Sequence, residues 1–208
     1  MDIAIDEVEV KLGPIPRETI VICHDGGRQS NWPNYTHSLL QLTSIKTETR
    51  WIFDICGGQY GIYKPFWTRS EYKQYYFKIG ESWKVYPHGT NKAYMHAFKD
   101  VRDIWSMTYG VVGEVAKAMD VSIIDWEKSF DLKLSTLVSS GDDKSTDYKA
   151  SLLTAMETAV RNFMRSYDMK SVLAASQVYE TTFPGRRAID FRKIRDGFWA
   201  AHLPSIEH

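Results

Sequence analysis

The chain has 208 residues, of which 43% are hydrophobic and 13% aromatic, a composition that suits a folded domain with a core of its own. Its 26 basic and 26 acidic residues balance, so no net charge draws the whole surface towards nucleic acid. No apolar run reaches about 18 residues, which excludes a transmembrane helix. The acidic N-terminus without a signal-peptide pattern predicts a cytoplasmic protein whose two cysteines stay reduced.

The first strands are predicted from alternation and from turn residues. Residues 8–12 alternate between apolar and charged side chains, and residues 19–23 are rich in β-branched side chains. Asp25-Gly26-Gly27 then predicts a turn, because short polar residues and glycines tolerate tight backbone conformations. These features indicate that the N-terminal part of the chain forms a β-sheet.

A β-hairpin is predicted next. The β-prone runs 35–42 and 51–61 flank a polar loop over residues 43–50. In the aromatic-rich stretch that follows, Ser70 predicts the cap of a short helix, and Gly80 predicts its end.

The second part of the chain has helical texture. Apolar residues between 98 and 119 approximate a helical stripe, and the polar residues 139–145 predict a loop. The clearest helix covers residues 148–167, where apolar side chains recur at i, i+3 and i+4. Residues 187–201 predict a further helix that is amphipathic and basic.

These textures predict an α+β fold, with an antiparallel β-sheet in the N-terminal half packed against C-terminal helices. We expect a single domain over residues 1–208, β-rich over residues 1–89 and helical over residues 90–208.

The candidate catalytic pair lies on the predicted hairpin. With a turn centred near Ile45 and Lys46, His37 lies opposite Asp54, and both side chains point to the same face of the sheet. A carboxylate in this position holds an imidazole in one tautomer and stabilises its charged form. The pair therefore predicts a general base with its orienting acid, although a structural hydrogen bond would leave the same pattern.

The sequence Asp-Ile-Cys-Gly-Gly-Gln-Tyr-Gly at residues 54–61 resembles a segment of papain-like and transglutaminase-like enzymes. In that family one strand carries the histidine, the next carries the aspartate, and a Gln-aromatic-Gly sequence follows. The resemblance covers residues 35–61 and implies that His37 is the general base, Asp54 its orienting group and Gln59 a polar support. We expect Gln59, Tyr60 and Trp51 to bind substrate.

The nucleophile is open between several candidates. The related enzymes place a cysteine upstream at a helix start, whereas Cys23 follows an apparent strand. Cys23 is the candidate for covalent catalysis, and Cys56, two residues after Asp54, is the second. A third alternative has no nucleophile, with His37 and Asp54 acting as acid and base on an activated substrate. A fourth is a scaffold that has lost its activity.

No metal site and no cofactor are predicted. Cys23, His24 and Asp25 are consecutive, and neighbours on a strand point to opposite faces, so they do not surround one ion there. The glycines after Asp54 lack the spacing of a phosphate-binding loop.

One basic segment predicts contact with a nucleic acid backbone. It contains Arg186, Arg187, Arg192, Lys193 and Arg195, interleaved with aromatic residues. A solvated helix face is the alternative interpretation of the same charges.

The size and the His…Asp-x-x-Gly-x-Gln-Tyr-Gly pattern also resemble small fungal arginine-containing cyclodipeptide synthases. This resemblance implies amide-bond formation from aminoacyl-tRNA, with arginyl-tRNA as a partner. No membrane partner is predicted, because no apolar run is long enough. The predicted function is therefore acyl transfer to an amine by His37 and Asp54, with Cys23 as the covalent nucleophile. The alternatives are a papain-like or transglutaminase-like cysteine hydrolase or transferase acting on peptide amides, and an inactive binding module on that scaffold.

Overall fold

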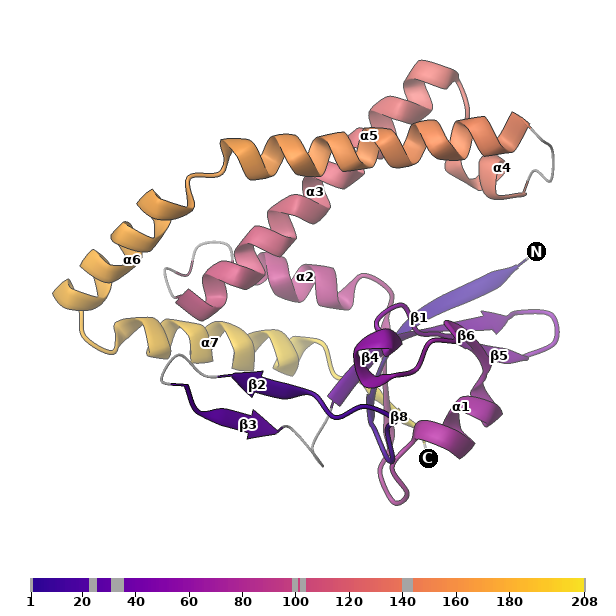
Figure 1. The fold of residues 1–208 in the computed structure, drawn as a ribbon, viewed down its shortest axis with the longest axis horizontal. Coiled ribbons are helices and arrows are strands. Elements are labelled where there is room, and N and C mark those ends of the chain that lie inside the picture. The colour runs from indigo at the N-terminus through magenta and orange to yellow at the C-terminus, as the bar shows by residue number, and fades with distance from the viewer. Residues whose placement is uncertain are drawn as a thin grey trace. The chain divides into compact units, whose positions relative to one another are not determined.

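A computed structural model describes residues 2–22, 26–30, 36–98, 101, 104–139 and 144–207 (Figure 1). The chain divides into two compact units, one of residues 1–91 with 200–208 and one of residues 92–199. Strands gather in the first unit and helices in the second, so the fold is α+β as predicted. The single domain over residues 1–208 stays a prediction.

A six-stranded antiparallel sheet forms the first unit, in the order β6-β5-β4-β1-β7-β8. A separate two-stranded sheet pairs β2 with β3, and the part of their connecting turn that the structure describes includes Gly26 at a positive φ of 81°. The predicted hairpin is confirmed, because β4 pairs with β5. The strands are β1 (Ile3–Lys11), β2 (Ile20–Ile22), β3 (Arg28–Ser30), β4 (Thr36–Ser44), β5 (Arg50–Phe53), β6 (Phe66–Thr68), β7 (Trp83–Pro87) and β8 (Ser205–Glu207).

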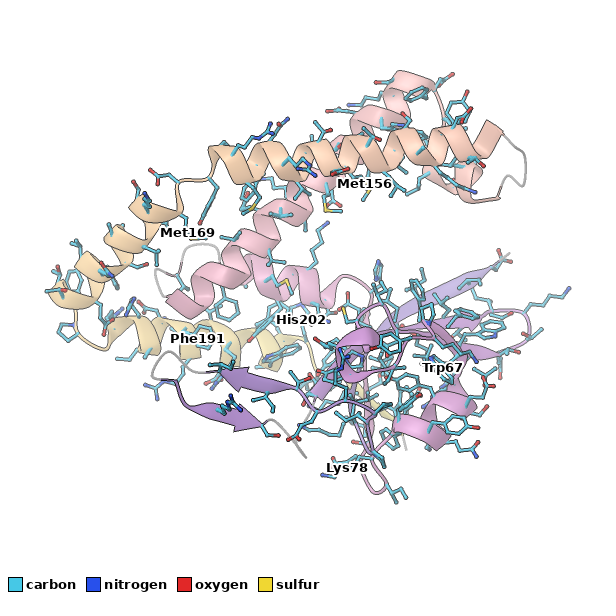
Figure 2. The ribbon with its side chains drawn as sticks, viewed as in Figure 1. Trp67, Lys78, Met156, Met169, Phe191 and His202 are labelled. Atoms are coloured by element: carbon cyan, nitrogen blue, oxygen red, sulfur yellow. The ribbon has the colours of Figure 1, made fainter. Side chains whose placement is uncertain are left out.

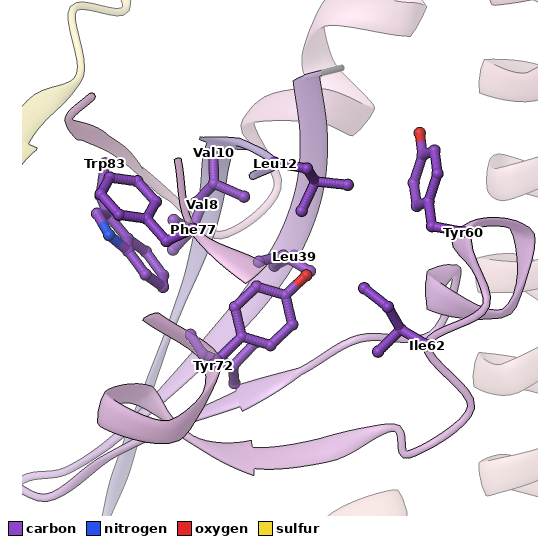
Figure 3. Close-up of a cluster of buried hydrophobic side chains, with 10 residues drawn as sticks. Val8, Val10, Leu12, Leu39, Tyr60, Ile62, Tyr72, Phe77 and Trp83 are labelled. Atoms are coloured by element: carbon purple, nitrogen blue, oxygen red, sulfur yellow. The ribbon is translucent and has the colours of Figure 1, made fainter. Parts of the chain in front are cut away.

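One face of the sheet is buried against the short helix α1 (Arg69–Tyr76). Val8 and Val10 alternate with more exposed residues along β1, and the register places Val8 opposite Leu39 on β4. Figure 3 shows these side chains gathered with Tyr72, which α1 contributes and which is fully buried. The period of two in the strands therefore creates the core, because it sends every second side chain to the same side.

The sheet curls so that its two ends approach each other. Glu207 on β8 accepts hydrogen bonds from Arg50 on β5 at 2.7 Å and from Arg69 on α1 at 2.6 Å. The strands β4, β1 and β7 lie between β5 and β8 in the sheet, so only strong curvature brings these charges together. The prediction that residues 90–208 are helical is wrong at residues 205–207, which return to the sheet as β8.

The cap of α1 differs from the predicted one. Thr68, rather than Ser70, is the N-cap: its hydroxyl accepts from the Glu71 amide at 3.3 Å, and the Glu71 carboxylate accepts from the Thr68 amide at 3.0 Å. The helix ends at Tyr76, before the predicted stop at Gly80, which instead takes a positive φ in the turn towards β7.

We expect Thr68→Ala to lower the free energy of unfolding by about 1 kcal/mol, because it leaves an amide at the start of α1 without its acceptor. Hydrogen bonds from Thr68 also hold the pKa of the Glu71 carboxyl below its usual value, so their contribution is present near neutral pH and lost as pH falls. Urea unfolding of Thr68→Ala beside Ser70→Ala measures the difference. An equal loss in Ser70→Ala would contradict the assignment of the cap.

The second unit is built from helices. α3 and α5 pack together around Trp126, Leu137 and Leu152, and the Trp126 indole donates to the Ser151 hydroxyl at 3.2 Å. The predicted stripe over residues 98–119 starts before α3. The helices are α2 (Thr90–Ala97), α3 (Ile104–Phe130), α4 (Leu134–Ser139), α5 (Lys144–Ser166), α6 (Met169–Thr182) and α7 (Arg186–Ala201).

Candidate active site

His37 and Asp54 form a buried pair, with 2.9 Å between His37 Nε2 and Asp54 Oδ1. The side chain of His37 is 3% exposed and that of Asp54 is 0% exposed. His37 lies on β4, and Asp54 is the first residue after β5, where its amide donates to the Pro65 carbonyl at 2.7 Å. The two side chains are therefore fixed from neighbouring strands and face the core of the first unit.

The hairpin register differs from the predicted one by two residues. Leu40 pairs with Phe53, so continuing the register places Asp54 across from Leu39, and His37 is its diagonal neighbour. The predicted position directly opposite is thus wrong. The pair forms nonetheless, because a shift of two residues keeps each side chain on the same face of the sheet.

Tyr72 completes a hydrogen-bonded triad of His37, Asp54 and Tyr72. Its hydroxyl donates to Asp54 Oδ2 at 3.0 Å, so each carboxylate oxygen has its own donor. Burial, with the neighbouring Asp54 carboxylate, raises the pKa of the Tyr72 hydroxyl far above its usual value. Tyr72 therefore remains a protonated donor and keeps the carboxylate oriented.

The triad fixes the tautomer of His37. A carboxylate oxygen only accepts, so Nε2 carries the hydrogen and Nδ1 is left as the nitrogen that accepts a proton. Protonation at Nδ1 would place a positive charge beside the Asp54 carboxylate, which stabilises it. The arrangement can thus serve as a general base.

The glycine-rich block after Asp54 closes around the carboxylate. The 3₁₀ helix η1 (Gly57–Tyr60) follows, and the ring of Tyr60 meets the His37 imidazole edge-on with 4.8 Å between centroids. A methyl group at Gly57 would lie 2.6 Å from Asp54 Oδ2, so the backbone there approaches as closely as glycine allows.

The structure separates the three predicted substrate-binding residues. Tyr60 is buried and contacts His37, whereas Gln59 is exposed on η1. Trp51 lies three residues before Asp54 and so points to the opposite face of the sheet, where it stacks on Phe66 with 6.5 Å between ring centroids. Trp51 therefore lies on the other face of the sheet from the pair, and the prediction that these three residues bind substrate stays a prediction.

Of the two cysteines, Cys56 alone lies in the part of the chain that the structure describes. Cys23 lies outside the described residues, with His24 and Asp25. Cys56 is exposed just before η1, whereas His37 and Asp54 are buried. The choice of nucleophile stays a prediction.

The basic segment on α7 is partly neutralised by acidic partners. Arg187 pairs with Glu180 at 2.5 Å, Arg186 with Asp190 at 3.2 Å and Arg195 with Asp196 at 2.8 Å. The other two members of the predicted nucleic-acid site, Arg192 and Lys193, are exposed. These pairs reduce the positive field that the sequence suggests, because a paired cation attracts phosphate less strongly.

Among the described side chains, no group of three or more His, Cys, Asp or Glu residues is placed to hold a metal ion. None of the helices in the described ranges combines the length and the apolar character needed to cross a membrane. Comparison with known proteins yields no matching family model, no matching curated protein and no matching solved structure.

Tyr72 is the site residue that sequence reasoning missed. It lies 18 residues after Asp54 in a stretch dense in tyrosines, where nothing distinguishes it from Tyr75 or Tyr76. One signal could have pointed to Tyr72. If the helix begins after Thr68, helical spacing places Tyr72 and Tyr76 on the same side of α1.

Proposed function

We propose that the chain is an acyl-transfer enzyme that forms amide bonds, with His37 as the general base. The observation that carries the proposal is the buried chain of hydrogen bonds from His37 through Asp54 to Tyr72. An imidazole held in one tautomer by a carboxylate is suited to taking a proton from an attacking amine. The resemblance of residues 54–61 to acyl-transferring enzymes supports the reaction class.

In this mechanism His37 Nδ1 accepts the proton as the amine nitrogen attacks the acyl carbonyl. The new C–N bond forms, the ester C–O bond breaks, and the proton passes from Nδ1 to the leaving oxygen. Asp54 balances the transient imidazolium charge, and Tyr72 holds Asp54 in place. Since an aminoacyl ester is already activated, this version needs no thiol. In the covalent version, Cys23 takes the acyl group first and His37 activates its thiol.

The most specific form of the proposal is a tRNA-dependent synthase of arginine-containing cyclic dipeptides. The exposed Arg192 and Lys193 on α7 support a contact with the tRNA backbone. This substrate class also rests on the resemblance of the His…Gln-Tyr-Gly pattern, and it is the first to be tested.

The test incubates the protein with ATP, total tRNA, an arginyl-tRNA synthetase and the twenty amino acids, and identifies products by mass spectrometry. We expect cyclic dipeptides from the wild type and a loss of about 10²–10⁴-fold in rate in His37→Ala. His88→Ala is the matched control, because its side chain is 61% exposed. Cys23→Ala and Cys56→Ala decide between the covalent and direct versions.

Added imidazole separates a chemical from a structural role for His37. Imidazole that enters the space left by His37→Ala restores a missing base, so we expect partial recovery of the rate at constant thermal stability. A folded His37→Ala protein with full activity would overturn the assignment of the base. The absence of product from every sample would remove the synthase version.

A non-catalytic binding module is the second candidate, and the burial of the triad favours it. Asp54 and Tyr72 are fully buried and His37 is 3% exposed, which is also what a structural polar network requires. For this candidate we expect His37→Ala to change stability while ligand binding persists.

A further inference from the structure

The second unit contains a cavity of about 480 Å³ beside α7, within the size range of sites for small organic molecules. All of its lining residues belong to the second unit, whereas the His37 triad belongs to the first. Its lining combines opposite charges with apolar surface, and consists of Val101, Tyr179, Arg187, Asp190, Lys193, Ile194 and Gly197.

One face of α7 supplies most of this lining. Positions 187, 190, 194 and 197 recur at helical spacing and so lie along one stripe of the helix. An adjacent face packs within the unit: Phe191, labelled in Figure 2, stacks on Phe98 with 4.8 Å between ring centroids. The helix is thus held by its aromatic residues while the neighbouring stripe faces the cavity.

Asp190 and Lys193 place opposite charges at the cavity without pairing with each other. They are three residues apart on one helix, a spacing at which such pairs commonly form. Asp190 instead accepts hydrogen bonds from Arg186 Nε at 3.4 Å and from the Tyr179 hydroxyl at 3.3 Å. Lys193 has no ion-pair partner among the described side chains. A ligand carboxylate would give Lys193 a partner, and a ligand ammonium group would join Arg186 and Tyr179 at the Asp190 carboxylate.

Gly197 keeps one wall of the cavity open. It lies inside α7, where glycine is less favourable than alanine, yet no atom lies within 4 Å of the position that a methyl group would take. Packing therefore does not require glycine there. What its small size provides is room beside Asp190 and Ile194.

We propose that this cavity binds a small zwitterion, an α-amino acid with an apolar side chain. Lys193 binds the carboxylate, Asp190 binds the ammonium group, and Val101 with Ile194 contacts the side chain. The inference goes beyond the proposed acyl transfer, because it concerns binding in the other unit and involves no reaction. It gives Lys193 an amino-acid carboxylate as its partner in place of the tRNA backbone.

The test measures binding of L-leucine and L-phenylalanine to the full chain by isothermal titration calorimetry. Leucinamide lacks the carboxylate charge and N-acetyl-leucine lacks the ammonium group, so we expect each to bind at least about tenfold more weakly than leucine. Equal affinities for leucine and both derivatives would contradict the proposal that the cavity recognises a zwitterion.

Variants locate the site. We expect Gly197→Leu to abolish binding by filling the cavity, and Gly197→Ala to retain the fold. Lys193→Gln should remove the preference for leucine over leucinamide. Asp190→Asn should remove the preference for leucine over N-acetyl-leucine. Arg192→Gln is the matched control, because it loses the same charge as Lys193→Gln on an exposed position outside the cavity.

Two outcomes would overturn the proposal. One is unchanged leucine binding in Gly197→Leu, which would place the site elsewhere. The other is no binding of leucine or phenylalanine to the wild type. Weaker tRNA binding in both Lys193→Gln and Arg192→Gln would then assign α7 to nucleic acid. Neither result depends on product formation, so failure here is distinguishable from failure of the acyl-transfer proposal.

Discussion

Asp54→Ala should lower the free energy of unfolding by about 3–5 kcal/mol, a loss typical of removing one partner from a buried charged network. The substitution leaves two buried groups without their acceptor, the Nε2–H of His37 and the hydroxyl of Tyr72. Each orphaned group costs about 1–3 kcal/mol, because water does not reach it to replace the lost hydrogen bond.

Urea unfolding at neutral pH measures this loss, and a double-mutant cycle assigns it. Tyr72→Phe removes one donor and keeps the ring in the core, so the cycle with Asp54→Ala isolates the contact between them. Asp196→Ala is the control, since its side chain is 65% exposed and we expect a change within about 0.5 kcal/mol. Additive losses in the cycle would show that the two side chains do not act as one network.

Alternation along the hairpin explains why the sequence predicts the central pair. The prediction needs only the parity of positions 37 and 54, and the error of two residues in the register leaves parity unchanged. The same rule places Trp51, three residues before Asp54, on the opposite face of the sheet. The alternation of side chains along a strand therefore predicts which residues lie together better than closeness in sequence does.

The remaining parts depend on contacts that local sequence does not encode. Tyr72 reaches Asp54 because α1 packs on β5 and β6, and the curvature of the sheet brings Arg50 to Glu207, 157 residues later in the chain. The strand β8 has three residues, too few for a recognisable alternation. β8 is part of the sheet because it pairs with β7, and residues 205–207 contain no pattern of their own that predicts a strand.

Charge counts along α7 mislead for a related reason. The sequence shows a run of basic residues, but the structure pairs Arg187 with Glu180, which precedes the helix on α6. Helical spacing within α7 predicts the i, i+4 pair of Arg186 with Asp190, but it does not predict the partner of Arg187, which lies on another helix. The prediction of a nucleic-acid surface therefore overestimates the charge that remains available.

Gly57→Ala should lower the free energy of unfolding by about 1–3 kcal/mol, the usual cost of overpacking a filled site. The added methyl group would lie 2.6 Å from Asp54 Oδ2 and 2.8 Å from the Ile62 carbonyl oxygen. The carboxylate is already held by His37 and Tyr72, so it moves away only by stretching those hydrogen bonds. If His37 is the general base, the displacement also lowers the rate, by up to about 10²-fold for a shift near 1 Å.

Gly58→Ala is the matched comparison, one residue further along η1. Neither glycine has a positive φ, so alanine suits both backbones, and a methyl group at Gly58 would lie 3.9 Å from the ring of Tyr63, an ordinary contact. We therefore expect Gly58→Ala to be neutral or to stabilise by about 0.4–1 kcal/mol, since alanine restricts the unfolded chain. Thermal and urea unfolding measure both variants. If the carboxylate of Asp54 sets the requirement for glycine, Gly57→Ala lowers the free energy of unfolding and Gly58→Ala does not. Equal changes would mean that the block Gly57-Gly58 is needed for its turn alone.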